Sequence, residues 1–113
     1  METLKNFHRR KTKVLTKENP DILAYETVPC IIECIAIIEV LKEYESDNIP
    51  PAWISLACCD NTHLNDGSLL KDALMAIDKY DQDMRYIGGI GINCCSGDYG
   101  KSWMFFRIEM LIK

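Results

Sequence analysis

The stretch DILAYET, residues 21–27, is short and mostly apolar, and a long apolar helix pattern follows it over 31–44. Two further stretches of the same kind, AWISLA at 52–57 and YIGGIGIN at 86–93, flank the clearest amphipathic helix pattern of the sequence, at 70–80. Buried parallel strands read as short apolar runs, and their alternation with helices is typical of crossover connections. The sequence therefore predicts an α/β fold with about three consecutive parallel strands.

The first 17 residues add a further helix, with a basic side and an apolar side. Its apolar positions are Leu4, Phe7, Val14 and Leu15, which share one helical face. Six Lys or Arg against Glu2 give this segment a charge of +5, although the whole chain carries −4. We interpret the basic side chains as the solvated side of a surface helix. We therefore expect neither a nucleic-acid partner nor a membrane partner.

Composition indicates an ordinary globular protein of a reducing compartment. Hydrophobic residues make up 48% of the 113 residues and charged residues 27%, which excludes the disordered and low-complexity classes. The opening residues contain no apolar leader, so we expect the six cysteines to be free thiols in the cytoplasm. Such thiols are either small buried hydrophobes or metal ligands. The adjacent pairs Cys58-Cys59 and Cys94-Cys95, at strand ends, give more weight to the metal-ligand alternative.

Chemically active side chains follow all three predicted strands. In parallel α/β folds, ligands bind at the carboxyl ends of the strands. These ends carry Glu26, then Cys58-Cys59-Asp60, then Asn93-Cys94-Cys95. A carboxylate and several thiols facing one mouth predict a metal site or a thiol-handling site. The alternative for Glu26 is an exposed carboxylate at a strand end without a function.

Several motifs in this order resemble those of homocysteine S-methyltransferases, which are zinc-dependent (β/α)₈ barrel enzymes. The motifs are the helix opening FHRR at 7–10, DILAYETVP at 21–29, PAWIS at 51–55, D-x-TH at 60–63 with DG at 66–67, and GINC at 91–94. The resemblance runs from about residue 6 to Cys94. It implies that the chain is a fragment of a TIM barrel, with residues 1–95 a partial homocysteine-binding domain and 96–113 a divergent tail.

The resemblance implies roles for three residues. Cys94 matches the first of three thiolate ligands of catalytic Zn²⁺, and Glu26 matches the glutamate that holds the homocysteine amino group. Asn93 matches the residue beside that ligand, which shapes the substrate site. Cys58 matches a family cysteine that is not a ligand. The implied reaction moves a methyl group from S-methylmethionine or S-adenosylmethionine to the zinc-bound thiolate of homocysteine and gives methionine.

The chain also departs from the family pattern. The two later zinc ligands and more than half of the barrel are missing, and the tail shows no clear helix or strand period. We therefore expect the chain alone to be inactive, and to be molten or prone to aggregation because barrel-facing side chains lose their partners. We assign that inner face to Leu23, Tyr25, Trp53, Ile54, Ile90 and Ile92. The alternative function is a non-catalytic thiol or metal-binding module built from Cys58, Cys59, Cys94 and Cys95.

Overall fold

The structure is a computed structural model that describes residues 1–45, 48–94 and 103–106; at Cys94 and in 103–106 it describes the backbone. The elements, in chain order, are α1 (Glu2–Thr16), β1 (Leu23–Val28), α2 (Ile31–Leu41), β2 (Ala52–Cys58), α3 (Leu70–Tyr80), the 3₁₀ helix η2 (Gln82–Met84), β3 (Ile87–Cys94) and β4 (Trp103–Phe106). The strand order is β1-β2-β3-β4. The first two pairs are parallel and β4 is antiparallel to β3.

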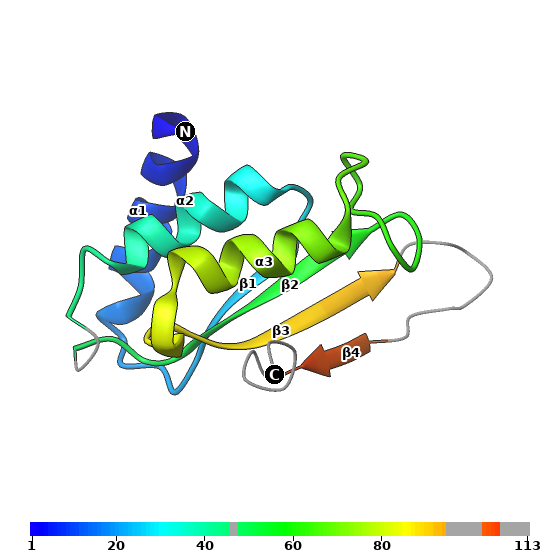
Figure 1. The fold of residues 1–113 in the computed structure, drawn as a ribbon. Helices are drawn as coiled ribbons and strands as arrows, with labels where there is room; N and C mark the ends of the chain where they lie inside the picture. The colour runs from blue at the N-terminus through cyan, green and yellow to red at the C-terminus, as the bar shows by residue number, and fades with distance from the viewer. Residues whose placement is uncertain (46–47, 95–102, 107–113) are drawn as a thin grey trace.

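The three parallel strands and their crossover helices confirm the predicted fold class. In Figure 1 the arrows of β1, β2 and β3 point the same way, and α2 and α3 lie over one face of the sheet. α2 packs between α1 and α3. The tail, which shows no clear helix or strand period in the sequence, contains strand β4 at 103–106, since β-sheet pairing with β3 decides this short segment more than its own pattern does.

The hydrophobic core lies between the sheet and its helices. Its fully buried large side chains come from α2, β2, α3, β3 and the loop before α3; they are Ile37, Ile38, Val40, Leu41, Ile54, Leu56, Leu64, Ile77, Ile87 and Ile90, with Val28 of β1. Side chains alternate between the two faces of a strand, so this burial also fixes the opposite face. That opposite face carries Ala24 and Glu26 of β1, Trp53 of β2 and Asn93 of β3.

The core corrects most of the predicted inner face. Leu23, Ile54 and Ile90 are buried in the helix-side core, and Tyr25 and Ile92 pack against it, so only Trp53 lies on the face away from the helices. The prediction placed these residues on the wrong face. Trp53 and Ile54 in particular cannot share a face, because neighbouring side chains of a strand alternate between the two faces. The expected aggregation of the isolated chain stays a prediction. It now rests on the edge strands, which are β1 and β4 among the described strands.

Helix α1 packs by its polar side, which the periodicity did not predict. His8 and Thr12 are its buried residues, whereas Phe7, Val14 and Leu15 are each at least half exposed. Specific hydrogen bonds explain this choice of face. The His8 Nε2 atom lies 2.9 Å from the Glu33 carboxylate of α2, and the Thr12 and Tyr25 hydroxyls are 2.5 Å apart.

A buried carboxylate closes the turn between α3 and β3. Asp81 is 1% exposed and accepts hydrogen bonds from the backbone N–H groups of Tyr86 and Ile87, the latter at 2.8 Å. Burial raises the pKa of this carboxyl, and the backbone bonds oppose that rise.

Among the described residues, no helix is long and apolar enough to cross a bilayer.

Candidate functional site

The three residues predicted for the site lie at the same end of the parallel sheet. Glu26 is exposed near the end of β1, on the face away from the helices. Asn93 is half-buried near the end of β3, and its Cα pairs with that of Ala57 in β2. The Cα of Cys94 pairs with that of Cys58, one position further along. The fold therefore brings these positions to one mouth, as expected for parallel strands.

Glu26 has an oriented carboxylate. The indole Nε1–H of Trp53, on the neighbouring strand, donates a hydrogen bond to Glu26 Oε1 at 3.1 Å. The register explains the contact, because Ala24 pairs with Trp53 and side chains two residues apart in a strand share a face. One carboxylate oxygen is thus held by the sheet, and the other has no partner among the described residues.

Ser55 lies on the same face as Glu26, one strand over. It lies two residues after Trp53 in β2, where the β1–β2 register shifts between Tyr25 and Val28. Its side chain is fully buried, and Oγ has no hydrogen-bond partner among the residues that the structure describes.

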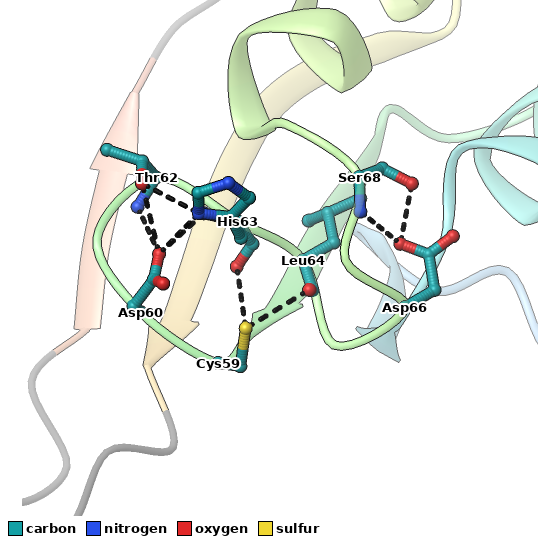
Figure 2. A network of polar contacts seen from close by, with 7 residues as sticks. All are labelled: Cys59, Asp60, Thr62, His63, Leu64, Asp66 and Ser68. Atoms are coloured by element: carbon teal, nitrogen blue, oxygen red, sulfur yellow. Dashed lines mark hydrogen bonds and ion pairs between the residues drawn. The ribbon is translucent and has the colours of Figure 1, made fainter.

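The loop between β2 and α3 folds back over the strand ends. Leu64 forms an antiparallel bridge with Cys58, and the N–H of Asp66 donates to the carbonyl of Pro29, just after β1. Asp66 in turn accepts hydrogen bonds from the N–H and the hydroxyl of Ser68. The backbone bonds hold residues 59–68 against the ends of β1 and β2. Figure 2 shows the polar contacts within this loop, with the Asp66–Ser68 pair at one end and the contacts around Asp60 at the other.

Asp60 organises the first half of this loop. Its Oδ1 accepts from the backbone N–H groups of Thr62 and His63, each at 2.8 Å, and from the Thr62 hydroxyl at 3.1 Å. The imidazole Nδ1 of His63 lies 3.0 Å from the same oxygen. The backbone bond from Thr62 first, then the His63 contact, lower the pKa of Asp60 to about 2. Asp60 is therefore a carboxylate at neutral pH and fixes the His63 ring.

The described cysteines differ sharply in exposure. Cys59 is an exposed free thiol whose sulfur contacts the Leu64 carbonyl at 3.3 Å. Cys34 is fully buried in α2, and burial raises its thiol pKa to about 12, so it remains protonated. Cys58 is also fully buried, at the end of β2. Cys95 and the side chain of Cys94 lie outside the described residues.

The described residues do not form a metal centre by themselves. Among them, no group of three or more His, Cys, Asp or Glu side chains gathers at metal-binding distance. The predicted ligand set needs three thiolates, and this chain supplies one of them, Cys94. The four-thiolate alternative falls partly outside the described residues, because it includes Cys95.

Sequence reasoning missed two features of the site. The first is Trp53, whose indole holds Glu26; only the strand register shows that the two residues share a face. The second is the Asp60–His63 pair, which the D-x-TH spacing signals, because an Asp side chain often accepts from N–H groups two and three residues on.

The fold defines a segment of a parallel α/β protein, a class in which ligands bind at the carboxyl ends of the strands. The family model described as homocysteine S-methyltransferase matches residues 1–104. The chain therefore belongs to the homocysteine S-methyltransferase family.

Curated relatives agree with this assignment. The chain is 38% identical over 93 residues to homocysteine S-methyltransferase YbgG of Bacillus subtilis (strain 168), covering 82% of this chain and 27% of that protein. It is 40% identical over 93 residues to homocysteine S-methyltransferase 2 of Zea mays, with 82% and 26% covered. Selenocysteine Se-methyltransferase of Brassica oleracea var. italica is 33% identical over 94 residues, with 83% and 25% covered.

Solved structures show the same fold. The homocysteine methyltransferase MmuM from Escherichia coli superposes with a TM-score of 0.71 and 33% identity in its apo and its metallated form. The match covers 86% of this chain, with 34% of the apo and 31% of the metallated chain. This chain thus spans about a quarter of the length of the curated relatives that it matches.

Proposed function

We propose that this chain is the central part of a homocysteine S-methyltransferase barrel and contributes one wall of its substrate site. The observation that carries the proposal is the position of Glu26, Asn93 and Cys94 at one mouth of a sheet that matches the MmuM fold. The reaction is the transfer of a methyl group from a sulfonium donor, S-methylmethionine or S-adenosylmethionine, to the sulfur of homocysteine. We place it in the cytoplasm, where thiols stay reduced.

Glu26 binds the ammonium group of homocysteine in this proposal. Its carboxylate is fixed by the Trp53 indole through Oε1 and keeps a second oxygen for the substrate. Charge-assisted hydrogen bonds of this kind are about twice as strong as neutral ones and hold a substrate in one orientation. Asn93, which follows Gly91 and Ile92 along β3, limits the space beside the substrate sulfur in this proposal.

Cys94 supplies one of three thiolates for a zinc ion, and the other two come from parts of the protein beyond this segment. Three thiolates leave one position on the metal for a substrate thiol, and such an ion stabilises the thiolate form of homocysteine. Cys94 does not form that site alone. We therefore expect the 113-residue chain to be inactive when isolated.

A chimera tests the proposed function. In this MmuM chimera, residues 1–94 of the chain replace the matching segment of the E. coli enzyme. We expect it to convert homocysteine and S-methylmethionine or S-adenosylmethionine to methionine, whereas the 113-residue chain alone does not. Selenocysteine serves as a competing methyl acceptor, since one relative is named for it. A folded chimera without turnover, or turnover by the isolated chain, contradicts the proposal.

A further inference from the structure

We propose that a pocket at the other end of the sheet, away from Glu26 and Asn93, binds a small organic phosphate. The pocket has a volume of about 460 Å³, within the ~300–1,000 Å³ of small-molecule sites. It lies between the C-terminal ends of α2 and α3 and the loop before β3. Its lining includes Lys42, Lys79, Tyr80, Asp81, Arg85 and Tyr86. None of these residues belongs to the proposed homocysteine site, so the inference is independent of the proposed function.

The pocket and the proposed homocysteine site lie at opposite ends of β3. Tyr86 directly precedes this strand, whereas Asn93 lies near its end, and the extended chain between them spans roughly 20 Å. Helices that connect parallel strands run back along the sheet, so α2 and α3 both end on the pocket side. Figure 1 shows both helices ending on the side where the strand arrows begin. The pocket is therefore a separate site.

Three cationic side chains from three segments line this pocket. Lys42 follows the last residue of α2, Lys79 lies in the last turn of α3, and Arg85 follows η2. The Nζ atoms of Lys42 and Lys79 lie 5.9 Å and 5.6 Å from the centre of the same ring, that of Tyr80. Like charges gathered around one ring repel each other, and an anion bound between them offsets this repulsion.

Carboxylates near the pocket offset only part of its positive charge. Asp81 is 1% exposed, and its oxygens accept the backbone N–H groups of Tyr86 and Ile87 at 3.2 Å and 2.8 Å. Glu39 lies 3.6 Å from the Lys42 ammonium and compensates part of one charge. The lining therefore carries three cations against one carboxylate. A phosphate monoester matches this surplus, because it carries about −1.5 to −2 charges at pH 7.

The loop before β3 holds Arg85 beside the pocket in spite of an unfavourable backbone. Asp83 and Met84 have φ angles of 63° and 52°, in the left-handed region that residues with a Cβ seldom adopt. The bond from the Ile87 N–H to Asp81 closes this loop. Strained backbone of this kind persists where the surrounding structure fixes it, and it is frequent at ligand sites. The guanidinium that follows is a planar fork suited to two phosphate oxygens.

Two tyrosines give the pocket an aromatic wall. Tyr80 and Tyr86 are half-buried and pack against the hydrophobic core. The Tyr86 hydroxyl donates a hydrogen bond to the Tyr44 carbonyl at 3.1 Å, which fixes the ring. A ring of a ligand gains contact area against such side chains in addition to the contacts of its phosphate group. The pocket thus favours an organic phosphate with an aromatic or other apolar part over phosphate alone.

An NMR titration of the MmuM chimera with phenyl phosphate tests the proposal, with inorganic phosphate as the reference probe. We expect the amide shifts of residues 79–86 to saturate, and phenyl phosphate to bind several-fold more tightly than inorganic phosphate. Lys79→Gln and Arg85→Gln should each weaken the binding of phenyl phosphate roughly 10-fold, the effect of one lost charge-assisted hydrogen bond. Lys71→Gln is the matched control, because Lys71 is an exposed lysine at the other end of α3.

The outcomes separate a built site from a general attraction of anions. The proposal is overturned if neither probe gives saturating shifts, or if both pocket variants bind phenyl phosphate like the unmodified chimera. It is also overturned if Lys71→Gln weakens binding as much as they do, or if inorganic phosphate binds as tightly as phenyl phosphate. Lys79 and Arg85 are exposed, so their variants should keep the fold, which thermal unfolding checks. None of these measurements uses homocysteine, so a negative result leaves the proposed function standing.

Discussion

Replacing Glu26 by Gln should weaken homocysteine binding by removing one charge and almost nothing else. In the chain as it stands, Trp53 Nε1 donates to Glu26 Oε1 at 3.1 Å. The glutamine keeps the length of the side chain and an Oε1 atom that can still accept this hydrogen bond. The loss is therefore the charged part of the contact with the substrate ammonium. A hydrogen bond to a charged group contributes about 1.5–3 kcal/mol, which corresponds to a roughly 10- to 150-fold weaker Kd.

Calorimetric titration of homocysteine into the MmuM chimera and into its Glu26→Gln variant measures this change. Glu39→Gln is the matched control, because Glu39 lies on α2 and pairs with Lys42 away from the strand ends. We expect the control to bind like the unmodified chimera, and we expect kcat at saturating homocysteine to change little in Glu26→Gln. An unchanged Kd in Glu26→Gln would refute the role of this carboxylate.

Three further predictions concern the loop, the core and the thiols. The pKa of Asp60 is about 2 in the folded chain against 3.8 ordinarily, so its carboxylate stabilises the loop above pH 4 and this stabilisation is lost as the pH falls toward 2. In Asp60→Asn, acid unfolding should therefore lack the loss of stability between pH 4 and pH 2. Asp81→Ala should lower the free energy of unfolding by about 1–3 kcal/mol, measured with denaturant, because the buried Ile87 N–H loses its acceptor, and Asp81→Asn should cost less. Iodoacetamide should label Cys59 long before Cys34 in peptide maps of the folded chimera, and equal rates would contradict the burial of Cys34.

Apolar runs were enough to predict the parallel strands, because a short apolar run between turn residues is a strong local signal for a strand. DILAYET and AWISLA mark β1 and β2 to within two residues. The face of each strand could not be predicted in the same way. Continuous apolar runs lack the alternation that distinguishes inside from outside, so Ile54 and Ile90 were assigned to the wrong face.

The packing face of α1 was also beyond sequence reasoning. A hydrophobic stripe predicts that apolar residues turn inward. Here hydrogen bonds of His8 with Glu33 and of Thr12 with Tyr25 draw the polar side inward instead. These partners are 25 and 13 residues away, and only the tertiary structure brings them together.

The positions of the candidate site residues were predictable from parallel-sheet geometry, since strand ends meet at one edge. Their supporting contacts were not. The Trp53 bond to Glu26 depends on the β1–β2 register, and the Asp60 bond to His63 depends on the turn that the loop adopts. The Trp53–Glu26 contact joins two strands and leaves no trace in the sequence, whereas the D-x-TH spacing is a local signal of the turn around Asp60.

Zinc content of the MmuM chimera tests most directly the claim that this segment contributes one metal ligand and no complete site. We expect the chimera to bind zinc, Cys94→Ser to lose it, and the double change of Cys58 and Cys59 to Ser to keep it. The 113-residue chain alone should bind no zinc tightly. Full zinc retention in Cys94→Ser, or its loss in the Cys58 and Cys59 double variant, would contradict the account and favour an independent thiol module.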